Sequence, residues 1–359
     1  MLRAIAFALR EIVALWPDFS ARIVAAYRPP HEGHNIILPL VRGDGAEGAE
    51  GVAHAACSSN YVTGHTIELC LIWVMSSLKH HLDNFLDTFP REKHLSNDPV
   101  QFVHRYEDSR DREIAGIIAS AFAYGNVKSV LRTVDSALSY LGSSPARTIA
   151  SFDPRKDMRR LRYFYHRFNT SRDLAVLFWI LRRTLEDYGS LESAFTAGLS
   201  SEDTEITAAL ENFSNILLGF GHEQLYPRGE LKRRIGVRFL LPRPSEGSAC
   251  KRMNLFLRWM VRPEDGIDCG VWTNVAPRQL IIPLDTHIAR ISSYIGLTSM
   301  RSPGWSMALD ITRSLRRLHA DDPVRYDFAL CHLGIAGDCP RKRNLEKCIR
   351  CPIVAICKL

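Results

Sequence analysis

Apolar residues recur at three- and four-residue steps along most of the chain from residue 76 onward, which is the spacing of one face of an α-helix. No segment shows the alternation of apolar and polar residues that a half-buried strand would need. We therefore expect an all-α fold. The pattern predicts helices over residues 76–89, 112–123, 127–141, 172–188, 191–199, 205–220, 250–261, 286–295, 305–318 and 323–333.

Helix starts and breaks support these assignments. Ser171, Asp285 and Pro323 stand where capping residues or first-turn prolines belong. Residues 1–78 differ, because their short apolar runs keep no helical or strand period. We interpret them as a poorly patterned N-terminal extension and expect translation to begin near Met75.

Composition is that of an ordinary globular protein, with 359 residues of which 46% are hydrophobic and 24% charged. This excludes a disordered, collagen-like or coiled-coil protein. The apolar runs are far shorter than the roughly 20 residues that cross a membrane. The first residues make a poor secretory signal because Arg3, Arg10 and Glu11 interrupt them. We therefore expect a cytoplasmic protein with reduced thiols and no membrane partner.

A cluster of cysteines lies at the C-terminal end. Cys339, Cys348, Cys351 and Cys357 follow one another at spacings of eight, two and five residues between them. Four thiolates on one short loop suit a [4Fe–4S] cluster or a tetrahedral Zn²⁺. The spacing does not separate these two centres, although a second C-x-x-C pair, typical of zinc, is missing. Four unrelated cysteines are the alternative.

The chain carries a formal net charge of +7, and its basic surplus lies toward the same end. Arg341, Lys342, Arg343 and Lys347 stand between the first two cysteines, so a bound metal would hold them as a compact basic loop. Such a loop suits contacts to phosphates, and a merely solvated loop is the alternative.

Two other segments carry candidate chemistry. Gly247, Ser248 and Ala249 form a small-residue turn before a predicted helix, where backbone N–H groups can approach a phosphate. Lys251 lies in the first turn of that helix, and an exposed surface lysine is the simpler reading. Asp285 follows an extended Pro-containing segment and precedes a helix, which predicts an N-cap and leaves catalysis as a second role.

The order of these segments resembles the helix-hairpin-helix DNA glycosylase superfamily, in particular its endonuclease III branch. There, a Leu-Pro-Gly-x-Gly-x-Lys-Thr-Ala-x-x-Val hairpin precedes Val-Asp-Thr-His-x-x-Arg and an iron–sulfur loop. The matching positions are Gly247, Lys251, Asn254 and Leu257 for the hairpin and its second helix, and Asp285, Thr286, His287 and Arg290 for the second motif.

The departures from that pattern are specific. Ala249 replaces the second hairpin glycine, Arg-Met follows Lys251 in place of Thr-Ala, and eight residues rather than six separate the first two cysteines. A helical insertion near 150–235 lengthens the barrel. Over 79–359 the chain more closely resembles an uncharacterised bacterial family of unknown function, whereas the glycosylase resemblance is specific only from about residue 245 onward.

The resemblance implies a two-lobed helical fold. Residues 79–111 with 284–359 would form a cluster-bearing domain, and residues 112–283 a barrel domain with the hairpin and the insertion. It implies that Asp285 stabilises the oxocarbenium-like sugar and takes a proton. It implies that Lys251 attacks the sugar carbon to form a Schiff base, which adds strand scission.

The resemblance also implies nucleic-acid contacts. The hairpin turn at 247–249 would hold a phosphate, and Phe122 or Tyr124 would fill the gap left by an extruded base. A core position is the alternative for Phe122, and a structural role is expected for His287.

We therefore expect a monomeric, nucleoid-associated DNA-binding enzyme of base excision, an N-glycosylase with or without abasic-site lyase activity, that acts on damaged or mispaired DNA. A non-catalytic nucleic-acid-binding protein on the same scaffold is the alternative. A protein directed to RNA is a weaker third reading, because no RNA-binding module is recognisable in the sequence.

Overall fold

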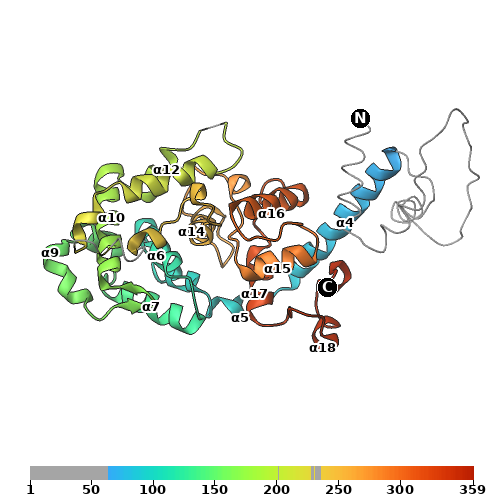
Figure 1. The fold of residues 1–359 in the computed structure, drawn as a ribbon, viewed down its shortest axis with the longest axis horizontal. Coiled ribbons are helices and arrows are strands. Elements are labelled where there is room, and N and C mark those ends of the chain that lie inside the picture. Colours follow the sequence, from blue (N-terminus) through green and yellow to red (C-terminus); the bar gives the residue numbers. More distant parts are fainter. Residues whose placement is uncertain (1–63, 201, 228–229, 231–235) are drawn as a thin grey trace, which may run out of the picture.

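The computed structural model describes residues 64–200, 202–227, 230 and 236–359, and this part of the chain is mostly helical (Figure 1). The expected all-α class is confirmed. The α-helices are α4 (Gly64–Thr88), α5 (Arg91–Leu95), α6 (Ser109–Ala121), α7 (Val127–Ser139), α8 (Pro145–Ala150), α9 (Pro154–Asp157), α10 (Ser171–Tyr188), α11 (Leu191–Thr196), α12 (Thr207–Leu218), α14 (Lys251–Val261), α15 (Thr286–Tyr294), α16 (Trp305–Leu318), α17 (Asp327–Ile335) and α18 (Leu345–Cys348).

Short 3₁₀ helices and one hairpin complete the described elements. The 3₁₀ helices are η1 (Pro99–Arg105), η2 (Met158–Leu161), η3 (His222–Leu225), η4 (Gly236–Phe239), η5 (Pro244–Glu246), η6 (Pro277–Gln279) and η7 (Val354–Ile356). Strands β1 (Tyr165–His166) and β2 (Asn169–Thr170) pair antiparallel, with His166 opposite Asn169. Two-residue strands are too short to produce the alternating pattern by which a sequence reveals a strand.

Each predicted helix has a counterpart in the structure, with differences at the ends that are largest for α4, which begins at Gly64 rather than at residue 76. Asp285 caps α15 as expected. Thr170 rather than Ser171 caps α10, through a capping box with Asp173. The last predicted helix begins later than Pro323, because residues 323–326 form turns before α17.

The expected N-terminal extension lies mostly outside the described residues, since only 64–78 of it are described. Those residues belong to α4, which runs without a break past Met75 and residue 78. The boundary expected at residue 78 therefore falls inside a helix. Among the described residues, no helix combines the length and the apolar character that crossing a membrane requires.

The helices occupy two sides of the molecule (Figure 1). Those from α6 to α12 lie on the left of that view, whereas α15, α16 and α17 lie on the right together with α4, and α14 lies between. Helices α6 and α14 pack closely. A Cβ at Gly116 would lie 2.9 Å from Cε of Met260 and 3.3 Å from the ring of Phe256, so a larger residue there would require the Met260 side chain to shift.

Helices α15 and α17 approach still more closely. A Cβ at Gly334 would lie 2.5 Å from Nδ1 of His287 and 2.6 Å from its Cβ. His287 therefore packs directly on the backbone of α17, which supports the structural role expected for it. This contact fixes the N-terminal end of α15, where the candidate site begins.

Candidate functional site

Folding brings Lys251 and Asp285 together. Lys251 opens α14 and Asp285 caps α15, and Nζ of the lysine lies 3.7 Å from Oδ2 of the aspartate. The other carboxylate oxygen, Oδ1, accepts hydrogen bonds of 2.8 Å from the backbone N–H groups of His287 and Ile288. The side chains are 33% and 13% exposed, respectively. Capping thus fixes the carboxylate and leaves Oδ2 directed at the ammonium.

The pair lies in the wall of an open hollow of about 640 Å³, which we call the outer groove. The groove is formed by the segment between α6 and α7, the turn before α14, and the start of α15. It is lined by Ala123, Tyr124, Gly125, Asn126, Val127, Phe239, Pro242, Ser248, Ala249, Cys250, Lys251, Arg252, Asp285, Thr286, His287 and Ile335.

A second hollow of about 130 Å³, the inner cavity, shares several lining residues with the outer groove, among them Tyr124, Gly125 and Lys251. Its lining combines apolar side chains with ionisable ones from distant segments. The apolar members include Val127, Val130, Leu255, Pro283 and Phe328, and the polar members are Asn97, Asp98, Lys251, Arg258, Asp327, Cys331 and His332.

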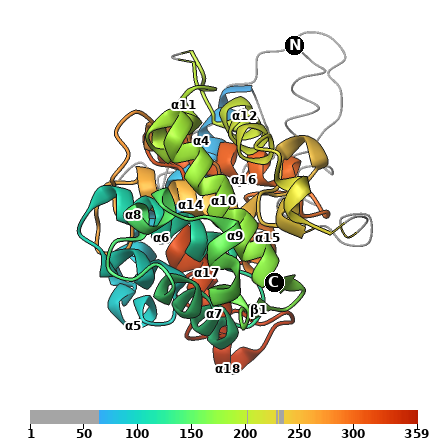
Figure 2. The same ribbon diagram turned by 90° about the vertical axis from the view of Figure 1, so that its left-hand side faces the viewer.

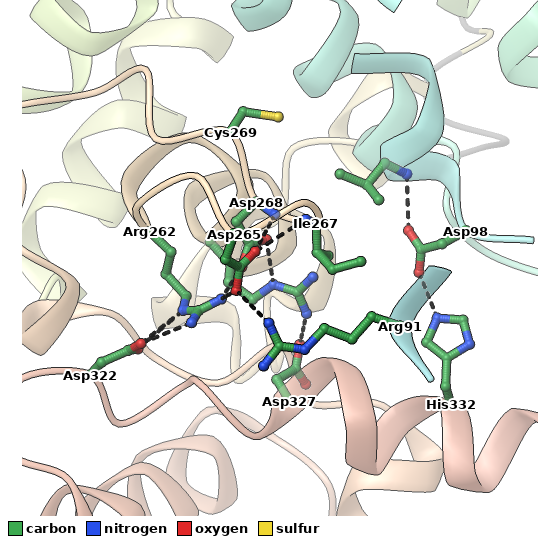
Figure 3. Close-up of polar contacts among 12 residues, drawn as sticks. Arg91, Asp98, Arg262, Asp265, Ile267, Asp268, Cys269, Asp322, Asp327 and His332 are labelled. Carbon is green, nitrogen blue, oxygen red and sulfur yellow. Dashed lines mark hydrogen bonds and ion pairs between the residues drawn. The ribbon is translucent and has the colours of Figure 1, made fainter. Parts of the chain in front are cut away.

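A buried ion network surrounds one end of the inner cavity (Figure 3). Arg258 pairs with Asp268 at 3.0 Å and with Asp327, and all three side chains are at most 3% exposed. Arg262 forms ion pairs with both Asp268 and Asp322. Burial raises the pKa of Asp327 to about 6, although Arg258 opposes that shift. One carboxylate oxygen of Asp327 is buried and has no hydrogen-bond partner among the described residues.

A histidine and a carboxylate form a second polar contact in the same lining. Nε2 of His332 lies 3.0 Å from Oδ2 of Asp98, as Figure 3 shows. Burial alone would raise the pKa of Asp98, but the hydrogen bond and charge of His332 outweigh it, so the pKa lies below its usual value. Asp98 is therefore held as a carboxylate beside the cavity.

Apart from Lys251 and Tyr124, sequence reasoning did not single out the residues that line the inner cavity. Cys331 is the clearest omission, because its Sγ lies 3.5 Å from Oδ2 of Asp285 and burial raises the pKa of its thiol. Nothing in its sequence neighbourhood marks it. Arg258 carries one usable signal, since it follows Lys251 by seven residues and so lies two turns along the same helix face.

The turn before α14 has the backbone that its small residues suggested. Gly247 adopts a left-handed φ of 72°, and Ser248 and Ala249 line the outer groove. Cys250 also adopts a left-handed φ, of 47°, although it carries a side chain. Gly247 itself is exposed and does not line the groove.

The two aromatic residues expected to enter DNA differ in burial. Phe122 is completely buried, with its ring 5.1 Å from that of Phe164, so its assignment to DNA insertion is wrong and the core alternative applies. Tyr124 lines both the outer groove and the inner cavity. Its hydroxyl donates to the backbone oxygen of His166 at 3.2 Å, which fixes the ring in the groove wall.

His166 supports the groove wall and makes it sensitive to pH. Its Nε2 contacts the backbone oxygen of Tyr124 at 3.0 Å, its Nδ1 contacts the hydroxyl of Thr133 at 2.8 Å, and burial lowers its pKa. The unfolded state therefore binds more protons at low pH. The stability that neutral His166 contributes is complete above about pH 6.5 and is lost as the pH falls through the lower folded pKa.

We expect the free energy of unfolding, measured by urea denaturation, to fall between about pH 7 and about pH 5 by less in His166→Gln than in the unchanged protein. Substitution of the exposed His80 by Gln provides the matched control. Equal declines in His166→Gln and the unchanged protein would contradict the assignment.

The four C-terminal cysteines form no disulfide, and they lie close enough together for some of the thiols to affect the pKa of others. Burial raises the pKa of Cys339 and of Cys351, and neighbouring thiols add to both shifts. Cys348 and Cys357 act on each of them, and Cys339 acts on Cys351. Within the described residues, no group of three or more His, Cys, Asp or Glu side chains is arranged to hold a metal ion. The chemistry of the four thiols is that of ligands to a sulfur-bound centre, but their side chains are not gathered around one point in this structure.

The basic loop between these cysteines is exposed and tied to α15. The hydroxyl of Tyr294 donates to the backbone oxygen of Arg341 at 2.9 Å, and Arg290 donates to that of Cys339, also at 2.9 Å. The Lys347 ammonium is bonded to the backbone oxygen of Gly337. Side-chain ion pairs of Arg341, Lys342, Arg343 and Lys347 are absent from the described part of the chain. Burial lowers the pKa of His287 in the outer groove, and the charge of Arg341 adds to that shift.

Comparison with known proteins gives one family. The model of the family described as "Protein of unknown function (DUF2400)" matches residues 98–336, a range that includes the lining of both hollows except Asn97 and that ends before Cys339. No curated protein and no solved structure matches the chain.

Proposed function

The chain belongs to the DUF2400 family, and we propose from its own groove that it is a DNA-binding base-excision enzyme, an N-glycosylase that also acts as an abasic-site lyase. The observation that carries this proposal is the position of the Lys251 ammonium, 3.7 Å from a capped carboxylate in the wall of an open groove. An amine and a carboxylate in that relation are the two groups that covalent release of a base requires.

The proposed chemistry uses both groups. Nζ of Lys251, as the neutral amine, forms a bond to C1′ of the nucleotide while the N-glycosidic bond breaks and the base leaves with the bonding electrons. Oδ2 of Asp285 stabilises the positive sugar and takes the proton that the amine loses. The C1′–O4′ bond then breaks, O4′ takes the proton held by Asp285, and the opened sugar is left as a Schiff base with Lys251. Loss of a proton from C2′ then eliminates the 3′ phosphate, which cuts the strand.

The inner cavity is the proposed receptacle for the extruded base. Its apolar members, such as Val127 and Phe328, suit the faces of a base, and its polar end suits the base edge. Asp98 supplies a carboxylate acceptor there, and His332 and Asp327 line the same end. The extruded nucleotide would pass Tyr124, which lines both hollows.

The larger arrangement follows from the same proposal. We propose a two-lobed helix-hairpin-helix architecture, with a barrel lobe that contributes Lys251 and a cluster-bearing lobe that contributes Asp285. The turn at 247–249 and the basic loop at 341–347 would contact phosphates of one duplex, so that a monomer suffices. A cytoplasmic, nucleoid-associated location accords with that partner.

We also propose that Cys339, Cys348, Cys351 and Cys357 hold a [4Fe–4S] cluster, with Zn²⁺ as the alternative. The centre would keep the basic loop rigid. Anaerobically purified protein should show the broad visible absorption of thiolate-bound iron and a matching iron content. Colourless protein with one equivalent of zinc would instead establish the alternative.

Borohydride trapping on a duplex with a single abasic site tests the lyase proposal. The unchanged protein should form a covalent adduct, and Lys251→Gln should form none because no amine remains at that position. Lys128→Gln is the matched control, because this exposed lysine lies near the groove but does not line it. Failure of the unchanged protein to form any adduct, together with no base release from a panel of lesions, would reject the enzyme.

A non-catalytic nucleic-acid-binding protein is the second candidate. The same ion pair favours it, because a lysine held by a capping carboxylate also serves as a fixed positive charge for a phosphate. In that case Lys251→Gln would weaken DNA binding while the unchanged protein forms no adduct.

A further inference from the structure

The β1–β2 hairpin presents an unusual set of exposed side chains next to the outer groove. Tyr163, Tyr165 and Phe168 are 79%, 67% and 49% exposed. The guanidinium of Arg162 lies 4.4 Å above the ring of Tyr163, and Arg167 is exposed at the hairpin tip. We call these five residues the aromatic hairpin surface. In Figure 2 the hairpin lies beside α7, near the end of the molecule that faces the viewer.

Positive charge surrounds these rings. Residues 155–168 contain six Lys and Arg side chains but one acidic side chain, Asp157. Asp157 pairs with Arg160 at 3.7 Å, and Asp153 with Lys156 at 3.7 Å. The described part of the chain provides no acidic ion-pair partner for the remaining four, which are Arg155, Arg159, Arg162 and Arg167.

The hairpin tip places a cation at the groove rim. Arg167 adopts a φ of 57°, a left-handed conformation that favours glycine. Its side chain lies against Gly125, where an added Cβ would be 3.0 Å from Nη1 of Arg167. Because Gly125 lines both hollows, Arg167 stands at their edge.

Phe168 of the aromatic hairpin surface packs against aromatic residues that line the outer groove. The centroid of Phe168 lies 4.6 Å from that of Phe239 and 5.6 Å from that of Tyr124, and both of these residues line the groove. Behind them, the buried guanidinium of Arg252 lies 3.9 Å from the Phe239 centroid. No carboxylate pairs with Arg252 within the described residues, so its charge adds positive potential to this wall.

We propose that the aromatic hairpin surface binds a single-stranded nucleic-acid segment beside the outer groove, with unpaired bases on its exposed rings and phosphates on its arginines. Exposed aromatic rings within a positive surface are the features by which proteins hold unpaired strands. Leu161 and Phe164 are buried, so the exposed side chains of this surface are aromatic and cationic rather than aliphatic. Because neither Lys251 nor Asp285 takes part, this binding is independent of the proposed chemistry.

Fluorescence anisotropy of the full chain with a labelled twelve-nucleotide oligothymidine tests this proposal. Tyr163→Ala/Tyr165→Ala should bind about 10-fold or more weakly, because stacking is lost, while the dependence of affinity on salt stays unchanged. Tyr188→Ala is the matched control, since this tyrosine is exposed at the end of α10.

Arg167→Gly separates charge from stacking without straining the hairpin, because glycine favours the backbone conformation found there. We expect weaker binding and a salt dependence whose logarithmic slope falls by about 0.7, which corresponds to one phosphate contact on a single strand. Arg313→Ala, on the exposed face of α16, should leave both quantities unchanged.

Two further arms make the outcome decisive. Lys93→Gln, at an exposed lysine of α5 that lines neither hollow, should bind the oligonucleotide as tightly as the unchanged protein, whether or not the lyase proposal is correct. Sedimentation with phosphatidylserine vesicles tests a membrane instead. Unchanged oligonucleotide affinity in the double tyrosine variant would overturn the proposal, and loss of vesicle binding alone in that variant would assign the surface to membranes.

Discussion

Replacement of Arg258 by alanine is expected to lower the free energy of unfolding by about 3–5 kcal/mol. Arg258 is the described side chain that pairs with Asp327, and it also pairs with Asp268, all three being buried. Without it, Asp327 becomes an isolated buried carboxylate whose solvation cost no partner offsets. Urea denaturation followed by circular dichroism measures the change, with the exposed Arg313→Ala as the matched control.

A double variant tests the reason for that loss. Arg258→Met/Asp327→Leu removes both charges of one pair, while Asp268 keeps its contact with Arg262. We expect it to recover part of the stability lost in Arg258→Ala, because apolar side chains replace an ion pair whose burial is costly. A change below about 1 kcal/mol in Arg258→Ala would show that the network does not stabilise the fold.

Asp285→Asn is expected to slow formation of the borohydride-trapped adduct by about 10²- to 10⁴-fold while the fold is kept. The amide oxygen of asparagine can still accept the backbone N–H groups at the start of α15, so capping persists. What disappears is the negative charge next to Lys251. The free energy of unfolding should therefore fall by less than about 1 kcal/mol, whereas Asp285→Ala should also lose the cap at a cost of about 1 kcal/mol.

Asp108→Asn is the control for this substitution, because Asp108 caps α6 through its side chain in the same way but does not line either hollow. Its adduct should form at the unchanged rate. If Asp285→Asn also retained that rate, Asp285 would be a helix cap without a part in the chemistry.

The elements that local patterns specify could be predicted well. Helices with one buried face, such as α7 and α16, follow directly from their apolar spacing. The cap at Asp285 is equally local, since it depends on an aspartate between an extended segment and a helix. The proximity of Lys251 and Asp285 came from the order of motifs and their resemblance to a known family rather than from local pattern.

Long-range neighbours could not be read from the chain. The inner cavity brings together Asp98 and His332, which are 234 positions apart, and no sequence pattern relates them.

Phe122 shows a different limit of sequence-based prediction. Every residue of α6 from Glu113 to Ala121 is buried, so this helix has no polar face by which the environment of Phe122 could be judged. The basic loop and the four cysteines were recognisable because they are contiguous.

Helix α15 connects the Asp285 carboxylate to the loop that carries the C-terminal cysteines. It is nine residues long, about 13 Å. Asp285 caps the start of this helix. Arg290, in its middle, and Tyr294, its last residue, donate hydrogen bonds to the backbone oxygens of Cys339 and Arg341, respectively. Both bonds go to backbone oxygens of the loop that carries the thiols, so a shift of that loop on thiol oxidation would reach the helix that Asp285 caps. We therefore expect protein handled in air to lose free-thiol titre and the rate of adduct formation together, so free-thiol content is the quantity by which preparations should be matched.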